Sequence, residues 1–156
     1  MKQDRVLFGI LGVIVLLVIV SLGLFFMRGG EQKYGPEDTP EGVVRNYVLA
    51  LNKQDYERAY TYLQDADYKP TFTEFRQNFI SSGWEMNSAG LQIGAVDIHD
   101  GEAIVRLTII HGGTAPFDSA WNENNDAWLS LQDGEWKITS IPSPYWGWDW
   151  YQDTQS

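Results

Sequence analysis

The sequence predicts an α+β domain, in which three N-terminal helices pack on a curved antiparallel sheet, preceded by one transmembrane helix. Three observations predict this arrangement. A long run without a charged side chain stands between Val6 and Met27. Apolar residues then recur at helical spacing from Thr39 to Ile80, and from Leu91 they alternate as in strands. The alternating regions also contain Asp-Gly pairs, which are strong signals for tight hairpin turns.

The apolar run is long enough to cross a bilayer. A helix rises about 1.5 Å per residue, so residues 6–27 would extend roughly 33 Å, against a hydrocarbon core of about 30 Å. A cleaved signal peptide has a shorter apolar region and a small-x-small cleavage site, which this run lacks. We therefore expect a single-pass anchor over residues 1–28, contact with the lipid bilayer through residues 6–27, and a cell-membrane location. The short amino end favours an extracytoplasmic C-terminal domain, although the flanking positive charges are nearly balanced.

Composition excludes several classes of function. The chain has a formal net charge of −10, and an acidic surface repels nucleic acid. It contains no cysteine, which rules out disulfides, thiolate catalysis and zinc–cysteine sites. With 2 histidines, a histidine-rich metal site is not expected either. We therefore expect no nucleic-acid partner, no metal and no cofactor.

A flexible polar linker is expected over residues 29–38, and the α+β domain over residues 39–142. Thr39 is a good N-cap residue, and Pro40 at the first helical position starts the first helix. Asp55 caps a second helix. The apolar faces of these two helices comprise Val43, Val44, Tyr47, Val48 and Leu51, and then Tyr56, Ala59, Tyr60 and Leu63.

The third helix starts at a capping box. Thr71 and Glu74 have the spacing in which each side chain bonds the backbone of the other residue. Gly83 suits the C-terminal cap of this helix. Its buried side is expected to comprise Phe72, Phe75, Phe79 and Ile80.

The two Asp-Gly turns fix the register of the strands if each forms a two-residue loop. His99 then opposes Glu102 in the first hairpin, and Leu131 opposes Trp136 in the second. The inward face comprises Val96, Ile98, Ala103, Val105, Leu107, Ile109, Ala127, Leu129, Leu131, Trp136 and Ile138. The outward face comprises Asp97, His99, Glu102, Arg106, Thr108, Trp128, Ser130, Lys137 and Thr139. Residues 116–126 are polar, and a loop between strands is expected there.

Two stretches of the domain carry a family resemblance, TPEGVVRNYVLALNKQDYERAYTYL and LQDGEWKITSI. They look like the opening helix pair and the closing hairpin of the nuclear transport factor 2-like superfamily, which includes ketosteroid isomerase and the SnoaL-like proteins. The resemblance spans Thr39 to Ile141 and implies a cystatin-like α+β cone. It also implies that an enzyme of this kind would hold an Asp or His deep in the cone, aided by a Tyr. Extracytoplasmic relatives are often binding or accessory modules, and neither stretch is a catalytic signature.

Few residues are candidates for chemistry. Asp97 and His99 lie two apart on one strand, but the predicted register places them on the polar outward face. His111 points toward the concave side, which makes it a weak catalytic candidate, with a hydrogen-bonded structural histidine as the alternative. Tyr47 and Tyr60 lie on helix core stripes and join His111 as candidates for lining a ligand pocket. No set of nucleophile, base and acid can be assembled.

The C-terminal tail, residues 143–156, is unusually aromatic. It is expected to interact through Tyr145, Trp146, Trp148, Trp150 and Tyr151. We expect the tail to fold back on the outward strand face, against Ile104, Trp128 and Ile141, with Trp146 or Trp148 as the main anchor. The alternatives are contact with the membrane interface, docking of a protein partner, and stacking on sugar rings with help from Asp149.

The expected function is a non-catalytic, membrane-anchored extracytoplasmic module that binds a protein partner or a small apolar ligand. One alternative is an acid–base enzyme of the isomerase or dehydratase type with its site in the cone. That alternative needs a buried Asp, Glu or His at the floor of the cone. Another alternative is an accessory subunit of a membrane complex. The sequence leaves the oligomeric state open.

Overall fold

The chain divides into two units, residues 1–33 and 34–156. The structure, a computed structural model, describes residues 2–28, 32–112 and 121–152, and the side chains of these residues except 2–9, 24–28 and 82–88. Each unit is considered by itself.

The first unit contains helix α1 (Lys2–Arg28). Its described large apolar side chains, within residues 10–23, are 49–61 % exposed. Among the residues that the structure describes, no helix is both long enough and apolar enough to cross a membrane. The predicted transmembrane helix is therefore not supported.

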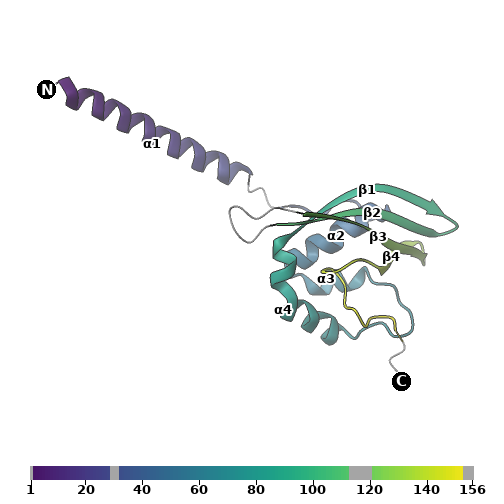
Figure 1. The fold of residues 1–156 in the computed structure, drawn as a ribbon. Helices are drawn as coiled ribbons and strands as arrows, with labels where there is room; N and C mark the ends of the chain where they lie inside the picture. The colour runs from purple at the N-terminus through teal and green to yellow at the C-terminus, as the bar shows by residue number, and fades with distance from the viewer. Residues whose placement is uncertain (1, 29–31, 113–120, 153–156) are drawn as a thin grey trace. The chain divides into compact units, whose positions relative to one another are not determined.

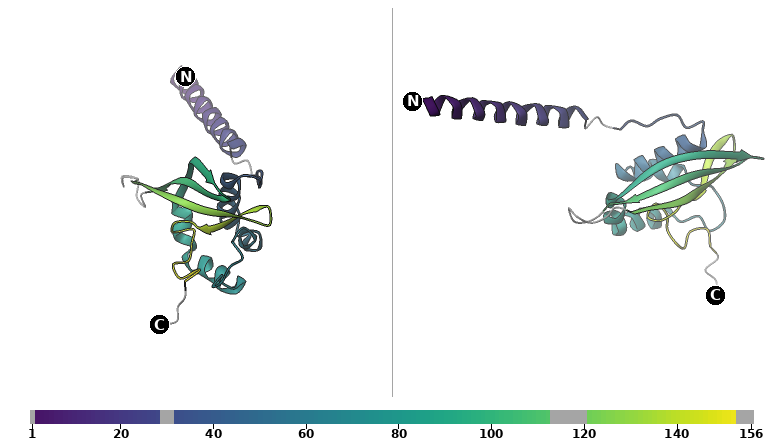
Figure 2. Two further views of the ribbon diagram at one scale, coloured as in Figure 1. Left: turned by 90° about the vertical axis from the view of Figure 1, so that its right-hand side faces the viewer. Right: turned by 45° about the horizontal axis from the view of Figure 1, so that its top comes forward.

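The second unit is an α+β fold of helices on an antiparallel sheet. Its elements are α2 (Pro40–Asn52), α3 (Tyr56–Thr61), α4 (Phe72–Ser88), β1 (Ala89–His99), β2 (Glu102–His111), β3 (Trp121–Gln132) and β4 (Glu135–Ser140). The strands form a four-stranded sheet in the order β1-β2-β3-β4. Helices α2, α3 and α4 lie on one face of this sheet, and the views in Figures 1 and 2 agree on this. The core lies between the helices and the concave face.

The starts of the helices confirm the predicted caps. The Thr39 side chain accepts a hydrogen bond from the Gly42 amide at 3.2 Å, and the Asp55 carboxylate accepts one from the Arg58 amide at 3.3 Å. At α4 the Thr71 amide donates to the Glu74 carboxylate at 2.8 Å, while the Glu74 amide donates to the Thr71 hydroxyl at 3.3 Å. This capping box pairs backbone groups that an open helix end would leave without partners.

The buried side of the helices was predicted well, except at Ile80 of α4. The predicted end of α4 at Gly83 was also wrong. Phe75 and Phe79 are fully buried, and all five predicted apolar residues of α2 are no more than 7 % exposed. Ile80 is 52 % exposed, because the buried stripe of α4 is narrower than its run of apolar residues. Gly83 does not end the helix, which continues to Ser88. The chain enters β1 directly from there, at Ala89 instead of the expected Leu91.

Both predicted hairpins are present with the predicted register. Asp100 and Gly101 have φ values of 48° and 82°, and Asp133 and Gly134 have values of 54° and 84°. Two successive positive φ values define the turn that matches the twist of two adjacent strands, and glycine adopts this conformation without strain. His99 therefore pairs with Glu102, and Leu131 with Trp136.

The facing of the strands follows from this register, except near the hairpin ends. Seven of the inward residues are buried, namely Ala103, Val105, Leu107, Ile109, Ala127, Leu129 and Ile138. Ile98 and Leu131 are 54 % and 49 % exposed, because they lie next to the hairpin turns at the edge of the packed core. A bulge between Ile93 and Val96, which the sequence analysis did not predict, shifts the register of β1. Bulges bend a strand and increase its twist, which suits a concave sheet.

The polar segment over residues 116–126 was predicted as a loop. Residues 113–120 lie outside the described residues, but Trp121 to Asp126 belong to β3 and pair with His111 to Arg106 of β2. Pairing with a neighbouring strand has overridden the low strand propensity of Asn and Asp in this stretch.

Part of the predicted flexible linker is fixed to the domain. The Tyr34 hydroxyl donates to the Asp55 carboxylate at 3.0 Å, and the Arg58 guanidinium lies over the Tyr34 ring at 3.6 Å. The Glu37 carboxylate accepts hydrogen bonds from the Tyr62 hydroxyl and the Arg58 guanidinium. The linker boundary at residue 38 was therefore placed too late, because these side chains attach residues 34–37 to α3.

The Glu37 contacts predict a dependence of stability on pH. Hydrogen bonds from Tyr62 and Arg58 lower the pKa of Glu37 below its ordinary value. A lowered pKa in the folded state adds stability above the unfolded pKa, and this contribution is lost as the pH falls through the folded pKa. We expect Glu37→Gln to lower the free energy of unfolding at pH 7 by about 0.5 kcal/mol, since the paired Arg58 and Glu37 side chains are 38 % and 48 % exposed.

Urea unfolding at pH 7 and pH 3 measures this contribution. The difference in stability between wild type and Glu37→Gln should shrink toward zero at pH 3. Glu102→Gln, on the exposed outward face of β2, is the matched control and should show no such pH-dependent difference. An equal effect of both substitutions at both pH values would contradict the assignment to Glu37.

Candidate functional site

The C-terminal tail folds back on its own domain, but not where the sequence placed it. It lies on the helical side of the sheet (Figure 1), and Trp150, not Trp146 or Trp148, is the anchor. Trp150 is 7 % exposed and stacks on Phe75 with ring centroids 5.3 Å apart. The predicted docking face still exposes 45 % of Trp128. The phenylalanine stripe of α4 offers a larger apolar surface than the mostly polar outward strand face, which explains the difference.

Tyr145 fills the space between α2 and the sheet. It is 1 % exposed, and its backbone oxygen accepts a hydrogen bond at 2.7 Å from the hydroxyl of Tyr47. Its own hydroxyl donates to the Ala89 carbonyl at the start of β1, at 3.3 Å. Burial raises the pKa of Tyr47 well above its ordinary value, so this hydroxyl keeps its proton. The Tyr47 side chain therefore belongs to the packed core, with its polar atom satisfied.

The other tail residues and Tyr60 are also held by hydrogen bonds and ring contacts. The Tyr60 hydroxyl donates to the Pro70 carbonyl at 2.7 Å, and the Tyr151 hydroxyl donates to the Gln64 carbonyl. Trp146 contacts Trp150 and stacks on Tyr151, with centroids 5.0 and 5.7 Å apart. These contacts make Trp146, Trp150 and Tyr151 structural elements of the tail.

His111 is the last residue of β2, whereas Tyr47 lies on α2 and Tyr60 lies on α3. Its ring stacks on Trp121 of β3 with centroids 3.8 Å apart. Its Nε2 atom is 3.4 Å from a Glu123 carboxylate oxygen, within ion-pair range but without hydrogen-bond geometry. The structure thus gives His111 neighbours from one strand and does not join it to the two tyrosines in a shared pocket.

Among the described residues, the core contains no buried Asp, Glu, His, Lys or Arg for acid–base chemistry. Apart from the tyrosines, Asn46 is the one buried polar side chain there. Asp97 and His99 are exposed on the outward face, as predicted, and the His99 ring contacts Asp100 at 3.0 Å. Within the described ranges, no group of three or more His, Cys, Asp or Glu could hold a metal ion.

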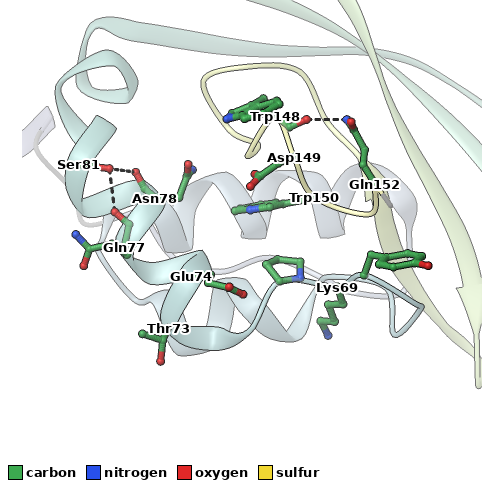
Figure 3. A pocket seen from close by; sticks show the side chains of 12 residues that line it. Lys69, Thr73, Glu74, Gln77, Asn78, Ser81, Trp148, Asp149, Trp150 and Gln152 are labelled. Atoms are coloured by element: carbon green, nitrogen blue, oxygen red, sulfur yellow. Dashed lines mark hydrogen bonds between the residues drawn. The ribbon is translucent and has the colours of Figure 1, made fainter. Parts of the chain in front are cut away.

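A surface groove of about 610 Å³ lies between α4 and the tail. Glu74 and Asn78 project into it from α4, whereas the Gln77 side chain, also at its edge, points away from the tail (Figure 3). Pro70 and Trp150 contribute the apolar part of its lining. The groove therefore opens to solvent on the outside of the same aromatic cluster that closes the core.

The tail forms the opposite wall of the groove. Trp148, Asp149 and Gln152 line it there (Figure 3). Tyr68 also belongs to the lining. The Gln152 amide donates to the Trp148 carbonyl at 2.7 Å, which fixes the local turn. Trp148 is 82 % exposed and Tyr68 is 56 % exposed. Two exposed rings thus flank a polar groove.

The charges at the groove are mainly negative. Lys69 is paired with Asp65 at 2.6 Å and also donates to the Leu63 carbonyl at 3.3 Å, so its charge is compensated within its own loop. Hydrogen bonds from the Thr71 backbone and side chain lower the pKa of Glu74 below its ordinary value. Glu74 is therefore ionised at neutral pH, and together with the acidic side chain of Asp149 it makes the groove repel anions.

Sequence analysis singled out Trp148 and Asp149, but did not predict this groove. The polar residues of α4 lie opposite its phenylalanine stripe, where a solvated helix face is the usual interpretation. The groove exists because Trp150 packs on Phe75 and thereby brings the tail alongside that face. No spacing in the sequence contains this information.

Comparison with known proteins gives structural similarity without a sequence match. No protein-family model and no curated protein sequence matches the chain. A SEC-C motif containing protein from Rhodopseudomonas palustris is 12 % identical, with a TM-score of 0.48 over 68 % of this chain and 79 % of that one. A Campylobacter jejuni protein described as an NTF2-like transpeptidase is 17 % identical, with a TM-score of 0.47 over 64 % and 96 %.

A cystatin-fold protein from Novosphingobium aromaticivorans is also similar. It is 12 % identical, with a TM-score of 0.45 over 67 % of this chain and 97 % of that one. The TM-scores of these three structures all lie below 0.5, so nothing about the function of this chain is taken from them.

Proposed function

We propose that the chain is a non-catalytic binding module of the nuclear transport factor 2-like superfamily, presented outside the cell by a membrane anchor. The order of elements supports the superfamily assignment: helices α2 to α4 precede a four-stranded antiparallel sheet and cover one of its faces. The neighbours described as NTF2-like and cystatin-fold proteins agree with this assignment but add no argument to it.

The observation that carries the non-catalytic part is the filling of the cone. Tyr145 and Trp150 belong to the same buried cluster as Tyr47, Phe75 and Leu107. Side chains of the tail therefore occupy the space where the resemblance implies an active site. An acid–base enzyme of the isomerase or dehydratase type would need an ionisable group there, and His111 lies instead beside Trp121 and Glu123.

The membrane anchor rests mainly on the sequence. Residues 6–27 contain no charged side chain, and the backbone of α1 is helical over Lys2–Arg28. The described large apolar side chains of residues 10–23 expose about half of their surface or more. In water such a helix would expose a large apolar surface, whereas lipid would cover it.

Membrane fractionation tests the anchor. We expect the full chain to remain in the membrane pellet after a carbonate wash. Leu16→Arg combined with Leu17→Arg should release it into the soluble fraction, since each charge near the centre of a span costs about 2.5–3.5 kcal/mol. Leu16→Ala combined with Leu17→Ala is the matched control and should stay in the pellet. Release of the unaltered chain, with its amino terminus intact by mass spectrometry, would refute the anchor.

A further inference from the structure

The groove between α4 and residues 148–152 is a candidate binding site that lies outside the cone. We propose that it binds an uncharged saccharide chain, with the Trp148 ring as the platform on which a sugar ring stacks. This proposal rests on the proposed function in one respect, namely that the domain is a binding module. It does not depend on the membrane anchor.

The first argument is the exposure of Trp148 on a fixed backbone. Its neighbour Trp150 is 7 % exposed, whereas the Trp148 ring is 82 % exposed. The Trp150 amide donates to the Gly147 carbonyl at 3.4 Å, and Gln152 donates to the Trp148 carbonyl at 2.7 Å. Bonds on both sides thus hold the Trp148 backbone, so the ring is presented without the entropic cost of ordering a free loop.

The second argument is the close packing under this turn. A Cβ atom added to Gly147 would lie 2.3 Å from atoms of the Trp150 ring, so the residue between Trp146 and Trp148 has to be glycine. The turn therefore buries one tryptophan against its own backbone and leaves the next tryptophan outside. A large exposed ring on a tightly built turn is typical of a binding contact more than of a packing residue.

The third argument is the polar chemistry around the ring. The Gln152 amide both donates and accepts hydrogen bonds, and the carboxylates of Glu74 and Asp149 accept several. A sugar presents a flat face of C–H groups together with a rim of hydroxyls, each of which donates and accepts. The C–H face suits the Trp148 ring, and the hydroxyl rim suits amides and carboxylates. The groove volume of about 610 Å³ falls within the usual range for small-molecule sites.

The fourth argument is the negative charge of the groove, which favours uncharged saccharides over anionic ones. Glu74 and Asp149 repel anions, and the charge of Lys69 is already paired with Asp65. Sugars that carry phosphate or carboxylate groups are therefore disfavoured. A lysine-rich peptide is the competing ligand, since carboxylates and aromatic rings also attract cations. The saccharide is favoured because the Glu74 Oε2 atom already accepts hydrogen bonds from the Thr71 amide and hydroxyl, both at 2.8 Å.

Isothermal titration of the full chain in lipid nanodiscs tests the proposal, because glycoside detergents would compete for the groove. The probes are maltotriose, cellotriose and the trimer of N-acetylglucosamine, with an oligolysine peptide for the competing class. We expect at least one trisaccharide to bind with a Kd below about 1 mM. Trp148→Ala should weaken this binding at least about tenfold, and Asp149→Ala about three- to tenfold.

Trp128→Ala is the matched control, since Trp128 is an exposed tryptophan on the outward face of β3, and its Kd should equal that of the wild type. Because Trp148 is exposed, its variant should melt with the wild type, which separates lost binding from lost folding. Failure of all three trisaccharides to bind overturns the proposal, and so does saccharide binding that Trp148→Ala leaves unchanged. Oligolysine binding that depends on Trp148 would replace the saccharide with a cationic peptide. In each of these cases, retention of the full chain in the membrane pellet still tests the membrane anchor independently of the saccharide site.

Discussion

Trp150→Ala should lower the free energy of unfolding by about 3–5 kcal/mol, the usual cost of truncating a buried tryptophan. Trp150 stacks on Phe75 at 5.3 Å and meets Phe79 and Trp146 edge-on at 5.6 and 5.0 Å. Removing the indole leaves a cavity at the junction of α4 and the tail. A domain is typically stable by about 5–15 kcal/mol, so this loss should be visible as a large drop in Tm. Urea unfolding of the full chain, followed by circular dichroism, measures it.

Trp148→Ala is the matched control for this experiment, because the same residue type stands two positions earlier and is 82 % exposed. It should change stability by no more than about 0.5 kcal/mol. If Trp150→Ala unfolds at the same urea concentration as the wild type, the tail does not belong to the core. The interior of the cone would then be open, and the acid–base alternative would regain its site.

Local signals in the sequence predicted the framework of the domain. The caps at Thr39, Asp55 and Thr71 depend on a side chain and a backbone amide two or three residues away, so they can be recognised without knowing the rest of the fold. The turns at Asp100-Gly101 and Asp133-Gly134 are equally local, and each one determines the facing of a whole hairpin.

Features that depend on distant contacts were not predictable in this way. Ile80 has the spacing of a core residue, but the structure leaves it 52 % exposed. The segment from Trp121 to Asp126 has the composition of a loop, but it pairs with β2 along its length. In both cases the outcome depends on which neighbour is available, and periodicity in a single segment does not contain that information.

The candidate groove shows the same limit. Composition identified the tail as unusual, and the apolar cost of exposed rings correctly implied that it folds back. Composition could not distinguish Trp150, which is buried, from Trp148, which is exposed. The choice follows from the position of the phenylalanines of α4, and the polar wall that includes Glu74 and Asn78 appears only once the tail lies beside them.

The tail also connects the interior of the cone with its surface. Tyr145 and Trp150 close the space between the helices and the sheet, and the same segment presents Trp148 at the surface groove. The packing of the tail therefore both fills the cone and forms the groove. An α+β cone with no buried Asp, Glu or His among its described residues therefore still has a surface groove, at which we propose binding.

Asn46→Ala should lower the free energy of unfolding by about 2–3 kcal/mol, because it leaves two backbone groups without partners. Asn46 is fully buried on α2. Its amide donates to the Gly35 carbonyl at 2.9 Å, and its side-chain oxygen accepts from the Gly35 amide at 2.8 Å. These two bonds hold the start of the domain against α2, so the Gly35 amide should exchange slowly with deuterium in the wild type and rapidly in the variant. Asn52→Ala, at the exposed end of the same helix, is the matched control and should stay within about 0.5 kcal/mol. Equal stability of the two variants, with Gly35 still protected, would show that residues 34–38 are held by the Tyr34 and Glu37 contacts alone.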